Sequence, residues 1–257
     1  MGKDFALILG GSKGIGFEVA NQMLAKNYNI ILNSRTPFEA YNKLKTNYPE
    51  DKIILLPGDI SEDSTLKNLI DILENLNKLD SILINYGGPN IKPFYEIHYN
   101  EWIDYFKLMF LSPLEIIKNT LKYLKNSEYP RIVAITSFTI KKITKNMIVS
   151  NSLRIALVNA LKTINLELSE EFNGKLLINA VAPGYINTHR LQDYISKQSK
   201  ILNISENEYI KNQIEKNILI KRIANTEEIA KFIAFLLSYE NTYINNQHIF
   251  FDGGIIY

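Results

Sequence analysis

The sequence has no cysteine in its 257 residues. Disulfides and thiolate metal sites are therefore excluded, and a reducing compartment is the default expectation. Long apolar runs are also missing, since no stretch approaches the roughly 18 residues of a membrane-spanning helix. Basic and acidic residues are interleaved and nearly balanced, with 29 Lys plus Arg, 27 Asp plus Glu and a formal net charge of +2. We expect a cytoplasmic protein, without a signal peptide, that binds neither membrane nor nucleic acid.

Histidine is scarce as well. The three histidines, His98, His189 and His248, do not have the spacing of metal ligands. Together with the missing cysteines, this predicts that the protein holds no metal ion. His189 borders a polar segment at 187–221, where it could touch a substrate, but we do not expect it to take part in catalysis.

Glycine is concentrated in one stretch near the start of the chain. The apolar run Phe5–Leu9 is followed by Gly10-Gly11-Ser12-Lys13-Gly14-Ile15-Gly16, and an amphipathic segment then extends to Leu24. This order predicts a strand, a tight turn and a helix, with glycines where the backbone must turn sharply or approach a ligand closely. The free N–H groups and the positive dipole end of such a helix suit a pyrophosphate. The stretch therefore predicts a dinucleotide site.

Strand-like and helical patterns alternate along the rest of the chain, with short loops between them. Strands are expected at 29–34, 52–56, 80–85, 131–136, 175–182 and 247–251. Helices are expected at 38–47, 63–77, 101–125, 148–169 and 226–237. Pro113 should kink the third of these helices. The pattern predicts one α/β domain over residues 1–257, with a doubly wound, Rossmann-like parallel sheet of about seven strands.

The segment 187–221 does not fit this alternation. It is polar, with scattered apolar residues such as Tyr194, Ile201 and Tyr209. An insertion of this length at the end of a regular framework is typical of a binding region. We therefore expect a lid-like insertion here.

Five short motifs occur in a familiar order. They are Gly10-x-x-x-Gly14-x-Gly16, Asp59-Ile60, Asp80-Ser81-Ile82-Leu83-Ile84-Asn85-Tyr86-Gly87, Pro183-Gly184-Tyr185-Ile186-Asn187-Thr188 and Phe251-Asp252-Gly253-Gly254. Over essentially the whole chain they resemble the short-chain dehydrogenases/reductases, whose second to fifth motifs include an adenine-contacting Asp, D-x-x-x-N-N-A-G, P-G-x-x-x-T and D-G-G. The resemblance implies an NAD(P)-dependent oxidoreductase that interconverts a carbonyl and an alcohol on a small-molecule substrate.

The resemblance also implies which residues hold the cofactor. They are Gly10, Ser12, Lys13, Gly14, Ile15, Gly16, Ser34, Arg35, Asp59, Ile60, Asn85, Tyr86, Gly87, Arg154, Pro183, Gly184, Ile186 and Thr188. NAD-preferring members usually carry an acidic residue at the end of the second strand, which accepts from the ribose 2′-OH. Here that position reads Asn33-Ser34-Arg35, and the cation of Lys13 lies in the glycine stretch. A 2′-phosphate would meet Arg35 and Lys13, so we expect NADP(H) to be preferred and NAD(H) to be possible.

The catalytic residues of the family are only partly present. Ser137 occupies the position of the family serine, whereas the Tyr and Lys spaced four residues apart are replaced by Ser150 and Arg154. The family's structural Asn is replaced by Met109, and the first Asn of N-N-A-G by Ile84. An alkyl hydroxyl is far less acidic than a phenol, and an arginine does not transfer its proton. We expect Ser137, Ser150 and Arg154 to form an atypical catalytic site, in which Arg154 also holds the nicotinamide ribose.

Another group would then have to supply the proton. Tyr86 and Tyr185 are candidates because each lies in a motif near the nicotinamide. Most of the 15 tyrosines must be packing or surface residues, so packing is the more frequent role for either one. Water is a further source. The lysines at 141, 142 and 145 precede the helix that carries Arg154, and we expect them to be solvated.

Two hypotheses of different classes follow. The first is an NADP(H)-dependent oxidoreductase with an atypical site; the second is a nucleotide-binding protein without turnover, acting as a sensor or as a subunit of a mixed oligomer. The retained Ser137, the P-G-x-x-x-T segment and the lid-length insertion favour the enzyme. The family commonly associates through its two long helices, here 101–125 and 148–169, which implies a homodimer or homotetramer.

Overall fold

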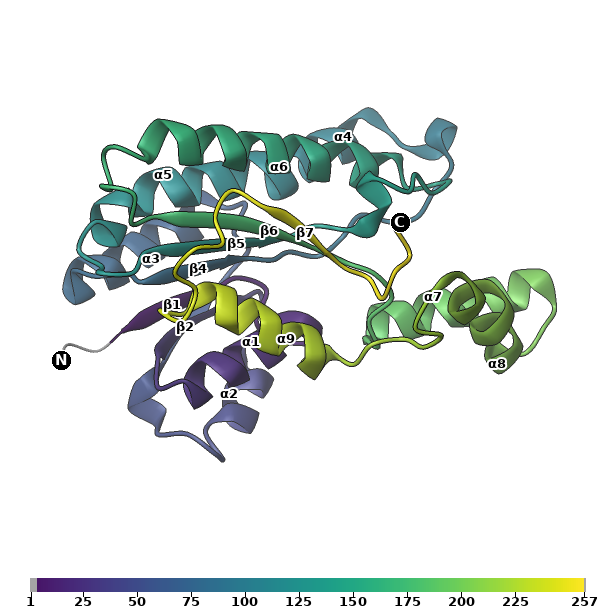
Figure 1. Cartoon of the computed structure of the whole chain (residues 1–257), viewed down its shortest axis with the longest axis horizontal. Helices are drawn as coiled ribbons and strands as arrows, with labels where there is room; N and C mark the ends of the chain where they lie inside the picture. Colours follow the sequence, from purple (N-terminus) through teal and green to yellow (C-terminus); the bar gives the residue numbers. More distant parts are fainter. Residues whose placement is uncertain (1–3, 257) are drawn as a thin grey trace.

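Residues 4–256 are described by a computed structural model, shown in Figure 1. Seven parallel strands form one sheet in the order β3-β2-β1-β4-β5-β6-β7. The strands are β1 (Phe5–Ile8), β2 (Asn29–Ser34), β3 (Ile53–Pro57), β4 (Ser81–Ile84), β5 (Arg131–Ile135), β6 (Leu177–Pro183) and β7 (His248–Phe251). The chain order reverses between β1 and β4, which makes the crevice beyond these strand ends the expected ligand site of a doubly wound sheet. The sequence prediction of such a sheet with seven strands is confirmed.

Helices cover both faces of the sheet (Figure 1). The helices are α1 (Gly14–Ala25), α2 (Phe38–Leu44), α3 (Asp63–Leu76), α4 (Tyr99–Phe106), α5 (Ser112–Leu124), α6 (Ile148–Leu168), α7 (His189–Leu202), α8 (Glu206–Tyr209) and α9 (Thr226–Leu237). Leu7 packs with α3, α5 and α6, whereas its neighbours Ala6 and Ile8 pack with α1, α2 and α9. Successive side chains of a strand point to opposite faces, so a strand covered on both sides is apolar throughout.

The helix expected at 101–125 is interrupted. It consists of α4 and α5, joined by a π-helical turn at Lys107–Leu111. Pro113 lies in the first turn of α5, where its missing N–H group removes one helical hydrogen bond. Ser112 Oγ instead donates to Lys107 O at 2.8 Å. The proline therefore perturbs the helix as expected, but the perturbation takes the form of a π turn in the residues before it.

The segment 187–221 is mostly helical. It contains α7 and α8, a π turn at Ile210–Ile214 and a short 3₁₀ helix at Glu215–Asn217. In Figure 1 these helices extend beyond the carboxyl ends of the strands, away from the two helical layers. They enclose a small apolar cluster of their own. Its buried members are Ile195, Tyr209, Ile214, Ile218 and Ile255.

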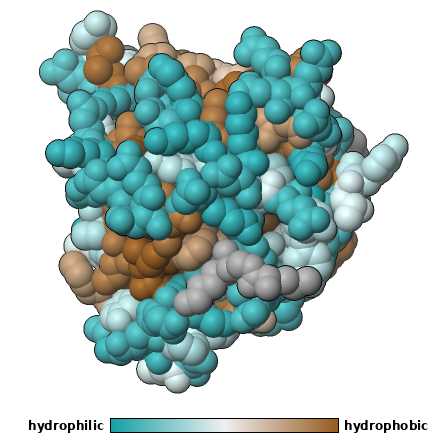
Figure 2. Space-filling view, turned by 90° about the vertical axis from the view of Figure 1, so that its left-hand side faces the viewer, coloured by the Kyte–Doolittle hydropathy of each residue, from teal (hydrophilic) through white to brown (hydrophobic). Residues whose placement is uncertain are grey.

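The carboxyl-terminal segment belongs to this outlying cluster. Asp252 turns the chain by accepting from Gly254 N at 2.9 Å and from Ile256 N at 3.0 Å, and Ile255 is buried against the helices. Figure 2 shows the opposite end of the molecule, where hydrophilic side chains predominate and hydrophobic areas lie between them. None of the helices in residues 4–256 is long and apolar enough to span a membrane.

Candidate functional site

The glycine stretch lies at the carboxyl end of β1 and packs tightly on the loop after β4. Gly10 has a positive φ of 62°, and a Cβ added there would lie 2.8 Å from Asn85 Nδ2. A Cβ on Gly16 would lie 2.3 Å from Gly10 O. Asn85 Nδ2 donates to the same oxygen at 3.1 Å and so joins the two loops. Any larger residue at these positions would push the start of α1 away from the crevice.

The first turn of α1 is open toward a ligand. Lys13 at its N-cap is extended and forms no side-chain cap hydrogen bond, and the turn contains no acidic residue. The first N–H groups of the helix, which include those of Gly14 and Ile15, therefore keep their hydrogens for another acceptor. A Cβ on Gly14 would lie 3.5 Å from Thr188 Cγ2, so Thr188 faces this turn from the segment after β6. The turn therefore suits a pyrophosphate.

The carboxyl end of β2 carries the features of a phosphate site. Gly11 N donates to Asn33 O at 2.9 Å, which places Lys13 and Arg35 at the same edge. Both cations are exposed, and within residues 4–256 neither pairs with a carboxylate. Ser34 Oγ is buried and has no hydrogen-bond partner. This combination fits an adenosine 2′-phosphate better than a free 2′-hydroxyl.

The remaining predicted cofactor residues line the same edge of the sheet. Asp59 accepts from Ser61 N and Ser61 Oγ at 2.9 and 2.7 Å, which fixes its carboxylate after β3. Gly184 lies so close to the end of β7 that an added Cβ would be 2.8 Å from Asp252 Cα. Ile186 pairs with Ala224 in an isolated parallel bridge. Thr188 Oγ1 accepts from Leu191 N at 3.3 Å, so its own hydrogen remains for a ligand. Ser12, Ile60, Gly87 and Pro183 belong to these same loops and strand ends.

Ser137 follows β5 and is held as a hydrogen-bond donor toward the crevice. Its Oγ accepts from Thr139 N at 3.2 Å and from Thr139 Oγ1 at 3.0 Å. A hydroxyl oxygen that accepts two hydrogen bonds keeps its single hydrogen for a third partner. Ser137 therefore keeps an O–H group that can donate to a further partner.

Ser150 and Arg154 lie one helical turn apart in α6 and contact each other. Arg154 Nε donates to Ser150 Oγ at 3.2 Å, and Nη1 donates to Ile135 O and Thr136 O, both at 2.9 Å. The bonds to β5 bring the guanidinium next to Ser137. Burial lowers the pKa of Arg154, although a guanidinium stays protonated in proteins. Arg154 is therefore a buried cation with Ser150 as a neutral acceptor.

Tyr86 fills the space beneath this cation. Arg154 Cζ lies 5.3 Å from the centroid of the Tyr86 ring, within cation–π range. The Tyr86 hydroxyl is buried without a hydrogen-bond partner, and burial raises its pKa, an effect that the charge of Arg154 partly offsets. Met109 and Ile84, which the sequence resemblance matches to two family Asn residues, are completely buried in the same apolar cluster. The packing around the Tyr86 ring is therefore apolar.

Arg190 is a site residue that sequence reasoning missed. It is the second residue of α7, and its Nη2 donates to Pro89 O at 2.9 Å across the crevice. A Cβ on Gly88 would lie 2.2 Å from Arg190 Nη1, so the glycine is needed for this contact. Burial lowers the pKa of Arg190, and the charge of Arg154 lowers it further. The only sequence signal was its position two residues after Thr188.

The other candidate residues lie elsewhere. Burial raises the pKa of Tyr185 to about 12, and its ring packs on Phe138 with the centroids 5.4 Å apart. Lys141 lies over the ring of Phe250. His248 Nε2 lies 3.0 Å from Thr136 Oγ1, and burial lowers its pKa to about 4. Within the described residues, no group of three potential ligands could hold a metal ion.

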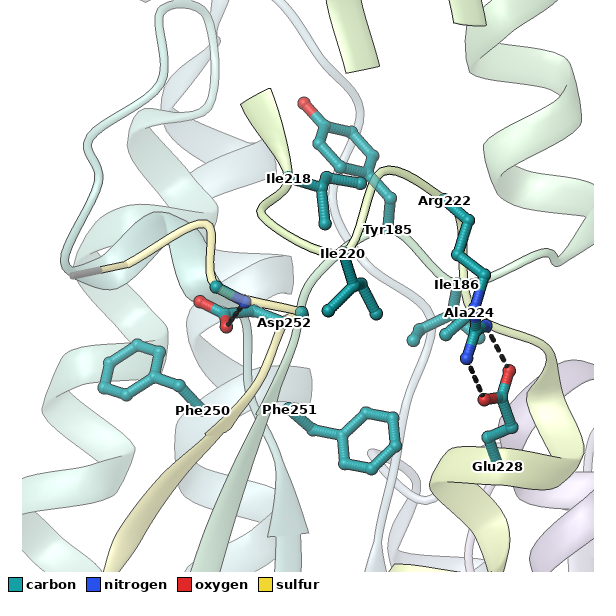
Figure 3. A pocket seen from close by; sticks show the side chains of 12 residues that line it. Tyr185, Ile186, Ile218, Ile220, Arg222, Ala224, Glu228, Phe250, Phe251 and Asp252 are labelled. Atoms are coloured by element: carbon teal, nitrogen blue, oxygen red, sulfur yellow. Dashed lines mark hydrogen bonds and ion pairs between the residues drawn. The ribbon is translucent and has the colours of Figure 1, made fainter. Parts of the chain in front are cut away.

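A cavity of about 310 Å³ lies between the end of β7 and the end of the 187–221 segment (Figure 3). Tyr185, Ile218 and Ile220 line it, together with Phe251 and Asp252. Neither Ser137 nor Arg154 belongs to its wall, and nor does the glycine stretch.

Comparison with known proteins agrees with this geometry. The family model described as enoyl-(acyl carrier protein) reductase matches residues 10–256. The chain belongs to the short-chain dehydrogenase/reductase family. Among its curated relatives is the NADPH-dependent reductase BacG of Bacillus subtilis. The two are 29% identical over 258 aligned residues, which cover 99% of this chain and 98% of BacG.

Solved structures show the same similarity. The structure of YwfH, described as an NADPH-dependent reductase involved in bacilysin biosynthesis, has a TM-score of 0.89 and 28% identity over 99% of this chain and 98% of YwfH. ElxO with NADP bound has a TM-score of 0.83 and 26% identity over 98% of each chain. The L-sorbose reductase of Gluconobacter frateurii, with a TM-score of 0.90 but 22% identity over 99% of this chain and 97% of the reductase, supports the fold alone.

Proposed function

We propose that this short-chain dehydrogenase/reductase is an NADPH-dependent reductase of small-molecule carbonyl compounds. The observation that carries the proposal is Ser137, whose oxygen accepts two hydrogen bonds from Thr139 so that its O–H group is left for a substrate. The glycine loop that follows β1, two strands away in the same sheet, is shaped for a dinucleotide. A protein that only bound the nucleotide would have no need of a donor at this position.

The choice of NADPH rests on charge. Lys13, Ser34 and Arg35 would hold the 2′-phosphate, Asp59 and Ile60 the adenine end, and the first turn of α1 with Thr188 the pyrophosphate. BacG and YwfH are both described as NADPH-dependent, which is consistent with this assignment. NAD(H) lacks the 2′-phosphate and would lose those contacts, so we expect it to bind more weakly.

The chemistry divides between the cofactor and the chain. Bound NADPH supplies a hydride to the carbonyl carbon. Ser137 donates a hydrogen bond to the carbonyl oxygen of the substrate. Arg154 is bonded to the backbone oxygen of Thr136, the residue before Ser137, and its buried charge favours the negative charge that develops on the substrate oxygen. Ser150 orients the guanidinium by accepting from Nε. Neither Ser150 nor Arg154 is a plausible acid, so water supplies the proton.

Tyr86 and Tyr185 are weaker candidates for that role than the sequence implied. The Tyr86 hydroxyl is enclosed, and burial raises the pKa of both phenols. A lysine beside the family Tyr would favour the phenolate instead. Loss of a positioned general acid typically costs about 10²–10⁴ in rate. We therefore expect slow turnover.

The alternative is a nucleotide-binding protein without turnover. The hydrogen bond from Arg154 to Ser150 supports it, because neither residue of this pair can readily transfer a proton. A stopped-flow experiment with NADPH bound and a panel of aldehydes and ketones separates the two. Oxidation of even one equivalent of NADPH supports the enzyme, whereas tight binding with no oxidation across the panel supports the alternative.

The segment 187–221 is proposed to act as a lid. Its own apolar cluster, separate from the two clusters that flank the sheet, would let it move as a unit. We also propose a cytoplasmic homodimer or homotetramer. Apolar side chains on the long helices remain exposed, and association would cover them. They include Ile103, Phe106, Leu111, Ile155 and Leu166.

A further inference from the structure

Two buried arginines of the chain differ in how completely they are paired. Arg131 uses all three guanidinium nitrogens, with Nε and Nη2 donating to Asn241 O and Nη1 to Pro130 O and Lys175 O. Arg154 uses only Nε and Nη1, although just 8% of it is exposed. Within residues 4–256 its Nη2 has no partner and no carboxylate faces it. Nη2 is not sealed from solvent, so its two N–H groups are open to a ligand in the crevice.

A second cation, Arg190, lies close to Arg154. Arg190 donates to Pro89 O through Nη2, while Nη1 and Nε have no partner among the described residues. Its side chain reaches over Gly88, two positions after the tyrosine on which Arg154 stacks. Arg154 and Arg190 are close enough for one charge to lower the pKa of the other. Because no carboxylate of the described residues pairs with either guanidinium, an anion bound between the two would be attracted by both charges.

The phosphates of the cofactor do not account for this anion. The first turn of α1 and the pair Lys13 and Arg35 already provide for them. The nicotinamide ribose is neutral and needs at most one of the two N–H groups on Arg154 Nη2. What remains is one N–H group of Arg154 and four N–H groups of Arg190, one on Nε, two on Nη1 and one on Nη2.

We propose that Arg154 and Arg190 bind a carboxylate of the substrate, so that the carbonyl compound reduced is a short oxo acid; this inference rests on the proposed function. Arg154 Nη1 bonds to Thr136 O, the residue before Ser137. The carboxylate therefore lies next to the carbonyl oxygen that Ser137 binds, as in a 2-oxo acid. Arginine suits the two oxygens of a carboxylate through paired N–H groups.

The carboxylate itself does not react. The carbonyl carbon gains a hydride as its π bond to oxygen breaks, and the oxygen gains a proton from water. NADPH is oxidised to NADP⁺, and the product is a hydroxy acid. The two arginines contribute by fixing the substrate and by reducing the electrostatic cost of forming an alkoxide beside a carboxylate.

The first test measures binding and does not depend on turnover. Oxamate and its neutral methyl ester are titrated by calorimetry into the protein saturated with NADP⁺. We expect oxamate to bind and methyl oxamate to bind about ten- to a hundredfold more weakly, the contribution of hydrogen bonds to a charged group. Equal binding of the two, or no binding of oxamate, would overturn the inference. Inorganic phosphate binding more tightly than oxamate would also overturn it, in favour of a phosphate ester.

The second test uses Arg190→Gln, which alters a partly exposed side chain and leaves Arg154 in place. This variant should bind oxamate about tenfold or more weakly, while its Kd for NADPH stays unchanged. Arg190→Lys should restore part of the lost affinity for oxamate. Lys197→Gln is the matched control, because it removes a cation from the same helix without facing Gly88. Equal effects of Arg190→Gln and Lys197→Gln would contradict a specific contact.

Turnover then separates this inference from the proposed function. With 2-oxobutanoate and its ethyl ester as substrates, Arg190→Gln should raise KM for the acid and leave KM for the ester unchanged. Oxamate binding without oxidation of NADPH by any carbonyl would refute the proposed function and retain the anion site. Rapid reduction of the ester but not of the acid would refute the anion site and retain the reductase.

Discussion

The guanidinium of Arg154 lies over the ring of Tyr86, with Cζ 5.3 Å from the ring centroid. The two residues come from different motifs, one from the loop after β4 and one from α6. The sequence resemblance matches Tyr86 to the alanine of the family's N-N-A-G motif and Arg154 to the family lysine. The ring and the cation pack against each other, so we expect a change at either position to affect the other.

Replacement of Tyr86 by Phe tests whether the tyrosine is only a packing partner. The stack on Arg154 should survive, and removal of an unpaired buried hydroxyl should leave the free energy of unfolding unchanged or raise it by up to about 1 kcal/mol. We expect kcat to stay within a few-fold of the wild-type value. Thermal unfolding and steady-state kinetics check both expectations. A fall in kcat of about 10² or more would instead identify Tyr86 as the proton donor.

Arg35→Asp tests the cofactor preference. The variant places a carboxylate where we expect the 2′-phosphate, so NADPH should bind at least about tenfold more weakly, while NADH should bind equally well or better. Fluorescence titration with both nucleotides measures the two Kd values. Lys45→Asp, at the end of α2, is a charge-matched control. Equal wild-type affinities for the two nucleotides would contradict the assignment.

The sequence predicted the framework more fully than the site. Apolar runs such as Asn29–Ser34 coincide with strands because buried parallel strands are apolar on both faces, and this signal is local. The roles expected for Ser137 and Arg154 came from the resemblance to the family, and they remain predictions. Arg190 was missed, because its contact with Pro89 joins residues 101 positions apart. The enclosure of the Tyr86 hydroxyl likewise depends on side chains from several elements.

The lid proposal predicts the pattern of hydrogen exchange. In the free protein, amides of 187–221 should exchange faster than those of the central strands, because the helices there are short and pack on a small separate cluster. NADPH with a bound substrate analogue should slow that exchange by ordering the segment against the crevice. Mass spectrometry of the two states gives the comparison. Protection equal to that of β4 and β5 in the free protein would exclude a mobile lid.

His248 predicts an acid limit to stability. Burial, and to a lesser extent the charge of Lys162, lowers its pKa to about 4 in the folded protein, against about 6.5 in an unfolded chain. The unfolded state therefore binds more protons between these values, so the free energy of unfolding should be intact above pH 6.5 and decline as the pH falls toward 4. Urea unfolding at several pH values should show this slope, and His248→Gln should reduce it. An unchanged slope in the variant would assign the decline to other groups.

The last prediction asks whether the family chemistry can be restored. Ser150→Tyr with Arg154→Lys would rebuild the proton-donating pair, but Ser150 is only 2% exposed and Tyr86 fills the adjoining space. Overpacking there would cost about 1–3 kcal/mol, so the double variant alone should be destabilised. Adding Tyr86→Ala removes the ring and returns the alanine of the family motif.

This triple variant should reduce carbonyl compounds about 10²–10⁴-fold faster than the wild type. Its rate should depend on pH through the ionisation of the introduced phenol. The matched control carries Phe in place of Tyr at position 150 with the other two changes, so it has the same bulk without the hydroxyl. Stopped-flow oxidation of NADPH measures all three proteins. If the triple variant and its control are equally active, or if the wild type is already the fastest, the chain has its own proton route and Ser150 with Arg154 are not remnants of the family pair. A rate gain confined to the variant with the phenol would show that cofactor and carbonyl are already placed for hydride transfer and that only the proton donor was missing.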